Sequence, residues 1–262
     1  MTIPIYQIDA FASKLFEGNP AAVCPLPRWL PDDLLQAIAA ENNLSETAYF
    51  VPRSDGRTLS ESHTPASEVD LCGHATLASA FVIFHFLQEL SSTIQFESRS
   101  GQLTVTRDGD WLVMNFPAQP PTPCDQPQAL AQGLGQTPGA CLQSEDYIAV
   151  FDSETDIKAL QPDFEALKRL DRRGVIVTAP SAQYDFVARF FAPKLAVPED
   201  PVTGSAYTQL APYWAERLGP KRFHVRQLSA RGGELMCEVV NERVFIYGKA
   251  VPYLQGRIDI PD

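Results

Sequence analysis

The chain has 262 residues, of which 45% are hydrophobic and 20% are charged, a composition typical of globular proteins. Its formal net charge of −11 and its pI near 4.8 argue against a polyanionic partner or an anionic membrane surface. We therefore expect no nucleic-acid partner and no membrane association.

The N-terminal stretch and the cysteines bear on the cellular compartment of the protein. The N-terminal stretch MTIPIYQIDAF has no basic region followed by an apolar run, so we expect no secretory signal. The five cysteines, at positions 24, 72, 124, 141 and 237, are odd in number and widely spaced. This pattern favours free thiols in a reducing compartment over a disulfide framework or a zinc site, and we expect all of them except Cys72 to be inert. We expect a cytoplasmic protein.

Two helices are predicted in the first half. The earlier one runs from Pro31 to about Asn43, and a strand follows it from Glu46. The later one is apolar on all its faces from Ala75 to Phe84, so it must be surrounded by protein. It is too short to span a bilayer. A sheet wrapped around this helix satisfies that demand.

The second half repeats the pattern of the first. Residues 98–114, SRSGQLTVTRDGDWLVM, align without a gap on residues 230–246, ARGGELMCEVVNERVFI, and each reads as a hairpin. The tripeptide at residues 73–75 precedes that at residues 204–206 by nearly the same offset. Each half should then run strand, helix, strands, buried helix and hairpin. We expect an α+β fold of two pseudo-symmetric domains, each a sheet or barrel around a central helix.

The boundary between the halves should lie at the proline-rich stretch 117–124. We expect an N-terminal domain of residues 1–117 and a C-terminal domain of residues 118–262, with the final strand free to pack on the N-terminal half. The second buried helix, SAYTQLAPYWAERLG, should end at Gly219, with a kink or a late start because of Pro212. Ser205 is well placed to cap its N-terminus.

The duplicated helix starts suggest a binding site. The first N–H groups of a helix have no internal partner and carry the positive end of its dipole. Gly73 and Gly204 remove the Cβ that would keep a ligand away from these amides. Because duplicated halves usually pack about a pseudo-twofold axis, the two helix starts could form a cradle for a carboxylate or an oxyanion. The alternative is that each glycine serves only close helix–sheet packing.

Six motifs resemble the phenazine biosynthesis PhzF-like family, relatives of diaminopimelate epimerase. They cover nearly the whole chain: GNPAAVC at 18–24, NLSETAYFV at 43–51, TPASEVDLCGHATLA at 64–78, EDPVTGSA at 199–206, LAPYWAERLG at 210–219 and ARGGEL at 230–235. The resemblance implies a diaminopimelate epimerase-like fold with a cleft between two domains. It also implies isomerisation by proton transfer, without metal or cofactor, on a small carboxylate substrate.

The resemblance also implies residue roles. Glu46 would act as the acid/base, and His74 and Asp200 would join it as catalytic residues. Substrate-binding residues would be Ser45, Gly73, Gly204 and Ser205. The chain departs from many members of the family at two positions. Those members have an aromatic residue before the Thr-Pro, where this chain has His63, and a histidine after the GSA, where this chain has Tyr207. Both departures leave the identity of the substrate open.

Each of these residues also has a structural interpretation. Taken without the resemblance, Glu46 is a solvated loop carboxylate, Asp200 is a turn acid beside a proline, and His74 bonds locally at a helix start. If Glu46 instead lies near an apolar cleft, desolvation would raise its pKa and let it exchange protons near neutrality.

Two other functions stay open. Cys72, just before Gly73, could be the base of a one-thiol epimerase or dehydratase, whereas Thr203 at the matching place is too weak an acid to be a second thiol-like base. The chain could also be a non-catalytic ligand-binding member of the fold. A homodimer is one possible assembly.

Overall fold

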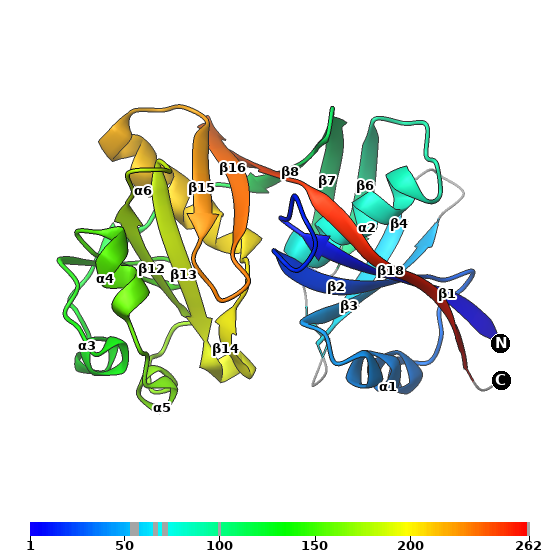
Figure 1. The fold of residues 1–262 in the computed structure, drawn as a ribbon, viewed down its shortest axis with the longest axis horizontal. Helices are drawn as coiled ribbons and strands as arrows, with labels where there is room; N and C mark the ends of the chain where they lie inside the picture. Colours follow the sequence, from blue (N-terminus) through cyan, green and yellow to red (C-terminus); the bar gives the residue numbers. More distant parts are fainter. Residues whose placement is uncertain (53–57, 65–67, 70–72, 99–100, 261–262) are drawn as a thin grey trace. The chain divides into compact units, whose positions relative to one another are not determined.

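The chain folds into two compact units (Figure 1). The computed structural model describes residues 1–52, 58–64, 68–69, 73–98 and 101–260. Unit 1 contains residues 1–115 and 247–262, and unit 2 contains residues 116–246. The C-terminal segment thus belongs to unit 1, where β18 (Ala250–Asp259) pairs antiparallel with β1 (Thr2–Ala10).

The strands of unit 1 follow one another in the order β18–β1–β2–β3–β4–β6–β7–β8, and β5 pairs with β4. The pairs β2–β3 and β4–β6 are parallel, and the others are antiparallel. The bounds are β2 (Asn19–Pro25), β3 (Glu46–Pro52), β4 (Thr58–His63), β5 (Glu68–Val69), β6 (Thr93–Ser98), β7 (Gly101–Asp108) and β8 (Trp111–Pro117).

The strands of unit 2 follow the order β9–β10–β11–β12–β13–β15–β16, and β14 pairs with β13. Here β11–β12 and β13–β15 are parallel. The bounds are β9 (Thr122–Pro123), β10 (Ala140–Gln143), β11 (Tyr147–Val150), β12 (Val175–Pro180), β13 (Phe186–Ala192), β14 (Val197–Asp200), β15 (Phe223–Gln227) and β16 (Gly233–Val240). The next strand, β17 (Arg243–Gly248), begins in unit 2, and its last two residues belong to unit 1.

The two units repeat one topology. Starting from β1 or from β10, the successive pairs are antiparallel, parallel, antiparallel, parallel and antiparallel, with a short strand added at the fourth member. Strands β2 and β3 therefore correspond to β11 and β12. The predicted α+β class with two pseudo-symmetric halves is confirmed.

The apolar helix of unit 1 is enclosed, as its sequence predicts. Helix α2 (Gly73–His85) packs on β1, β2 and β3, and nearly all its residues before His85 are buried (Figure 1). It approaches the end of β17 closely: a Cβ on Gly248 would lie 2.7 Å from both Leu77 and Phe11. The absence of a side chain at Gly248 lets the helix lie directly against this backbone.

The corresponding helix of unit 2 is α6 (Tyr207–Leu218), which a single 3₁₀ turn, Gly204–Ala206, precedes. Pro212 lies inside α6, and the helix continues through it to Gly219. The indole ring of Trp214 stacks on Phe186 with centroids 5.2 Å apart, and its N–H donates to Thr178 Oγ1 at 3.0 Å. These contacts fix α6 against the sheet.

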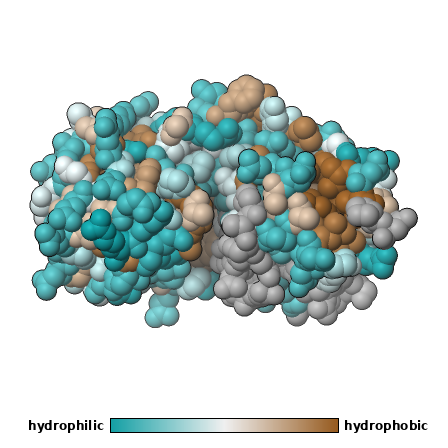
Figure 2. Space-filling view, turned by 90° about the horizontal axis from the view of Figure 1, so that it is seen from below, coloured by the Kyte–Doolittle hydropathy of each residue, from teal (hydrophilic) through white to brown (hydrophobic). Residues whose placement is uncertain are grey.

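Shorter helices cover the remaining surfaces: α1 (Asp32–Asn42) in unit 1, and α3 (Gln128–Leu134), α4 (Glu154–Ala159) and α5 (Phe164–Leu167) in unit 2. Helix α1 lies within one residue of its predicted bounds. Hydrophilic residues cover most of the face drawn in Figure 2, with hydrophobic residues gathered in a few places. Within the described ranges, no helix combines the length and apolarity needed to cross a bilayer.

Candidate functional site

Glu46 begins β3 in unit 1. Its side chain is only 8% exposed, so the interpretation as a solvated loop acid is wrong. Burial follows from the strand itself, because the residues Glu46–Phe50 are all buried and leave no exposed face at its start. Ser45, which precedes the strand, is half-buried.

His74 is the second residue of α2 and is 5% exposed. The side-chain amide nitrogen of Asn19 lies 3.3 Å from Nδ1 of His74, and Asn19 is itself fully buried. An amide nitrogen can only donate, so Nδ1 accepts and the ring proton sits on Nε2. Burial lowers the pKa of His74 from 6.5 to about 3. At neutral pH the ring is therefore uncharged and presents Nε2–H as a donor.

Glu46 and His74 lie at the same end of unit 1. Strands β2 and β3 are parallel with Ala21 opposite Glu46, and Asn19 starts β2 two residues before Ala21. Asn19 in turn contacts His74. Asn19 was not among the predicted site residues. Its position inside the GNPAAVC motif was the signal in the sequence that could have identified it.

Gly73 is buried at the first position of α2, next to His74. Its position at a helix start agrees with the prediction of an amide-rich turn. Cys72, on which the one-thiol alternative depends, lies outside the residues that the structure describes.

Asp200 ends β14 in unit 2 and is half-buried. Its carboxylate accepts a hydrogen bond from the hydroxyl of Thr203, and its backbone oxygen accepts one from Gln227 Nε2 at 2.8 Å. The side-chain oxygen of Gln227 also accepts from the Thr203 amide at 3.0 Å. The buried Gln227 thus holds the turn between Asp200 and Gly204 in one conformation, with Thr203 as a structural residue.

Gly204 and Ser205 lie in the 3₁₀ turn before α6, Gly204 buried and Ser205 half-buried. The prediction that Ser205 caps this helix is wrong, since the structure places it inside the turn and records no side-chain cap there. Instead its hydroxyl oxygen accepts a hydrogen bond from Arg173 Nη2 at 3.1 Å.

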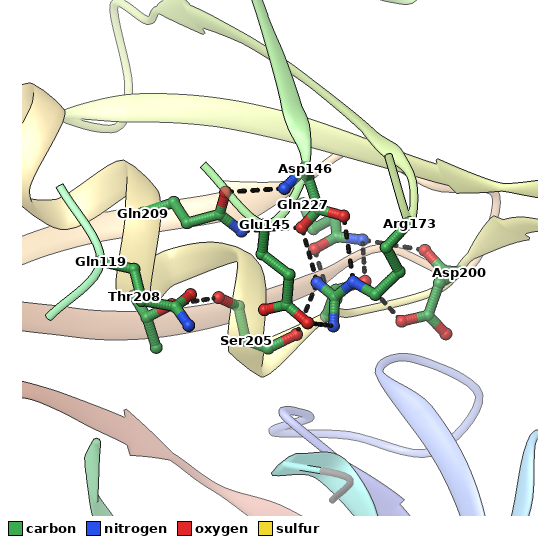
Figure 3. A network of polar contacts seen from close by, with 10 residues as sticks. Gln119, Glu145, Asp146, Arg173, Asp200, Ser205, Thr208, Gln209 and Gln227 are labelled. Atoms are coloured by element: carbon green, nitrogen blue, oxygen red, sulfur yellow. Dashed lines mark hydrogen bonds and ion pairs between the residues drawn. The ribbon is translucent and has the colours of Figure 1, made fainter. Parts of the chain in front are cut away.

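Arg173 belongs to a polar network that the sequence did not reveal (Figure 3). Its Nε and Nη2 donate to the two carboxylate oxygens of Asp146 at 3.0 and 2.6 Å, and Nη1 lies 3.2 Å from Glu145. Gln209 on α6 donates to Asp146 at 2.7 Å and accepts from its amide at 3.1 Å. Burial acts to lower the pKa of Arg173, but the hydrogen bond and charge of Asp146 outweigh it, and the pKa is raised.

The two departures from the family pattern are both buried. His63 is 3% exposed, with Nδ1 3.2 Å from Gln36 Oε1 and its ring edge-to-face with Tyr49. Tyr207 is fully buried, with its ring 6.3 Å from that of Phe186. Within its own unit each of these side chains is therefore a packing residue.

Three comparisons agree on the family. The phenazine biosynthesis-like protein family, PhzC-PhzF, matches residues 8–256. A Pseudomonas aeruginosa protein named as an uncharacterized isomerase is 54% identical over 99% of this chain and 100% of its own. A crystal structure from Enterococcus faecalis, of the phenazine biosynthesis protein PhzF family, is 43% identical and covers 99% of this chain and 100% of its own, with a TM-score of 0.96.

A more distant structure shares the fold alone. The structure of a protein named a predicted epimerase, from Pseudomonas aeruginosa, has a TM-score of 0.79 at 19% identity, over 99% of this chain and 100% of its own. The duplicated topology, the motifs and the near-complete coverage lead to one conclusion: the chain belongs to the phenazine biosynthesis-like, or PhzF, family.

Proposed function

We propose that this chain, an isomerase of the phenazine biosynthesis-like type, moves a proton between carbon atoms of a small carboxylate, with Glu46 as the acid/base. The burial of Glu46 at the start of β3 is the observation that carries the proposal. A carboxylate removed from water loses part of the solvation of its charged form, and this makes it a better proton acceptor at neutral pH.

The reaction needs no change in oxidation state of the protein. The Glu46 carboxylate removes a proton from a carbon next to a carbonyl or carboxylate group, and the electron pair of the C–H bond moves into the conjugated system of the substrate. The protonated Glu46 then returns the proton to a different carbon. The charge that develops on oxygen in between requires hydrogen-bond donors close to it.

His74 can serve as one of these donors. Because its ring is neutral and Nδ1 accepts from Asn19, the ring proton sits on Nε2, and in this proposal Nε2–H donates to a substrate oxygen. A neutral imidazole stabilises a developing oxyanion without first protonating the substrate. In this proposal His74 therefore orients and polarises the substrate, while Glu46 carries the proton.

In each unit, the amides at the start of the buried helix could bind an anionic oxygen of a substrate. Gly73 at α2 and Gly204 with Ser205 before α6 offer backbone N–H groups. Ser45, which directly precedes Glu46, would contribute a polar side chain to substrate binding. Asp200 would position the substrate or assist proton relay.

Solvent-deuterium incorporation tests the proposal. The full-length protein is incubated in D₂O with a panel of cyclic amino acids and unsaturated carboxylic acids, and carbon-bound deuterium is followed by NMR and mass spectrometry. The wild type should label at least one compound, and Glu46→Gln should slow this labelling by roughly 10²–10⁴-fold, the usual contribution of a general base.

Cys72→Ser is the matched variant for the rival mechanism. Labelling that persists in Glu46→Gln but is lost in Cys72→Ser would replace the proposal with one-thiol chemistry. A panel member that binds in calorimetry but never gains deuterium would instead favour a ligand-binding role.

A further inference from the structure

We propose that Arg173 is a positioning residue of the substrate site: it fixes the Ser205 hydroxyl as a hydrogen-bond donor and makes this position selective for a ligand oxygen that accepts a hydrogen bond. This inference rests on the proposed function in one respect, namely that Ser205 faces the substrate. Arg173 itself belongs to no motif that indicated the family.

Asp146 and Gln209 fix the position of the Arg173 guanidinium group. Asp146 is fully buried, and both its carboxylate oxygens accept from Arg173. Gln209 completes the anchor by pairing with both the side chain and the backbone amide of Asp146, which ties it to α6. A bidentate pair of this kind restricts the guanidinium to one plane.

The hydrogen bond between Arg173 and Ser205 can have only one direction. A guanidinium has five N–H donors and no acceptor, so Arg173 Nη2 donates and the Ser205 oxygen accepts. The hydroxyl hydrogen of Ser205 must then point away from Arg173. The position therefore favours a ligand atom that accepts a hydrogen bond over an ammonium or amide N–H, which can only donate.

The duplicated topology shows which residues of unit 1 correspond to this network of unit 2. In unit 1, the residue after the helix-start glycine, His74, contacts Asn19 at the start of β2, and β3 begins with Glu46. In unit 2, the residue after the helix-start glycine is Ser205, which contacts Arg173. Arg173 lies just before β12, and Asp146, which binds it, lies just before β11. The second half thus places an anchored cation where the first half places its proposed catalytic pair.

A thiol introduced at position 205 measures the effect without any substrate. Ser205→Cys is alkylated with iodoacetamide across pH 5 to 10, and modification of this site is followed by peptide mass spectrometry. An opposite charge within hydrogen-bond distance lowers a pKa by about 1–3 units. The alkylation midpoint of Ser205→Cys should therefore lie at least about one unit below that of Ser205→Cys combined with Arg173→Gln.

Removing Arg173 alone leaves the buried carboxylate of Asp146 without its cation and could destabilise the fold. A second variant is therefore needed in which this charge is also removed. Combining Ser205→Cys with both Asp146→Asn and Arg173→Gln keeps a neutral hydrogen-bonded pair at the anchor. Near-ultraviolet circular dichroism and thermal unfolding establish that each variant folds. Equal alkylation midpoints with and without Arg173, in folded proteins, would overturn the proposal. Absent deuterium labelling would instead count against the proposed function and leave this measurement valid.

An independent observation assigns a modification site at the edge of unit 2. The sulfur atoms of Cys124 and Cys141 lie 3.5 Å apart, and the Cys124 amide donates to the Cys141 carbonyl at 3.1 Å. The two residues continue the antiparallel register in which Leu142 faces Pro123. Facing residues of this kind have Cα atoms about 4.5–5.5 Å apart, within the range that a disulfide spans. We infer that the pair forms a disulfide on reaction with oxidised glutathione or a similar small disulfide.

The reaction balances as two exchange steps. The Cys124 thiolate attacks oxidised glutathione and releases one glutathione thiolate; the Cys141 thiolate then attacks the mixed disulfide and releases the second. Two protein thiols lose two protons and two electrons, and the glutathione disulfide is reduced. We assign the first attack to Cys124 because burial and the contact with Cys124 raise the pKa of the Cys141 thiol to about 12.

Intact-mass measurement under denaturing conditions tests this pair. After treatment with oxidised glutathione at pH 8, the wild type should lose the mass of two hydrogens, and peptide mapping should link residues 124 and 141. Cys124→Ser should abolish the link, whereas Cys237→Ser, which removes a buried cysteine elsewhere in unit 2, should retain it. Persistence of both free thiols, or glutathione adducts without the internal link, would overturn the inference.

Discussion

The side-chain amide nitrogen of Asn19 faces Nδ1 of His74 at 3.3 Å, with both side chains buried. This single contact sets the ring tautomer of His74, because the amide nitrogen can only donate. It joins the start of a strand to the start of the central helix, and so couples the fold of unit 1 to the protonation of a proposed catalytic residue.

The first prediction concerns the pH dependence of stability. His74 is buried and neutral with a pKa near 3 in the fold, whereas the unfolded chain has a value near 6.5. The unfolded state therefore binds more protons between these values, and stability is complete above pH 6.5 and declines as the pH falls toward 3. Urea unfolding at pH 7.5 and 5 should show a smaller loss in His74→Gln than in the wild type. Equal losses would contradict a neutral buried His74.

The second prediction tests the contact itself. Asn19→Asp places a carboxylate beside His74, which stabilises the imidazolium and should raise the pKa of His74 by at least about one unit. Long-range ¹H–¹⁵N NMR spectra of the ring nitrogens report both tautomer and pKa. Asn42→Asp is the control, because Asn42 bonds instead to Thr47 and should leave His74 unchanged.

The third prediction compares two glycines of unit 1. Gly248→Ala would place a Cβ 2.7 Å from the side chains of Leu77 and Phe11, so these two buried side chains must move. We expect a loss of about 1–3 kcal/mol in the free energy of unfolding, as for overpacked cores. Gly256→Ala meets only atoms at 3.7 Å and should be neutral or slightly stabilising. Chemical unfolding of both variants measures the difference, and similar losses would argue against close packing at residue 248.

The fourth prediction compares two buried tyrosines. The Tyr207 hydroxyl is buried and has no hydrogen-bond partner among the described residues, so Tyr207→Phe should be neutral or stabilising. The Tyr49 hydroxyl donates to the Leu35 carbonyl at 2.8 Å, so Tyr49→Phe should cost about 1 kcal/mol. Thermal unfolding at one pH provides both values. A clear loss in Tyr207→Phe would reveal a partner of its hydroxyl.

Much of the fold could be predicted from local pattern. The apolar run from Ala75 to Phe84 requires enclosure whatever surrounds it, and α2 is enclosed. The repeated turn and hairpin sequences predict repeated topology, because the same local patterns form the same strand pairs. Glu46 and His74 could be predicted as candidate site residues because they lie inside continuous motifs next to predicted element boundaries.

The capping role of Ser205 was predicted wrongly for a local reason. A serine before a helix usually accepts from the helix amides, but here Ser205 lies inside a 3₁₀ turn and its oxygen accepts from Arg173 instead. The preference of a residue type cannot indicate which of two competing donors reaches it.

The sequence by itself determined the duplication, the enclosed helix and the residues that mark the family, since each depends on spacing along the chain. Only the tertiary structure decided that Arg173, in the charged stretch 168–173, is anchored on the buried Asp146 and bonded to Ser205. It also decided that two widely spaced cysteines face each other. Such contacts join residues far apart in sequence, and strand register and helix packing set their distances and leave no periodic trace in the chain.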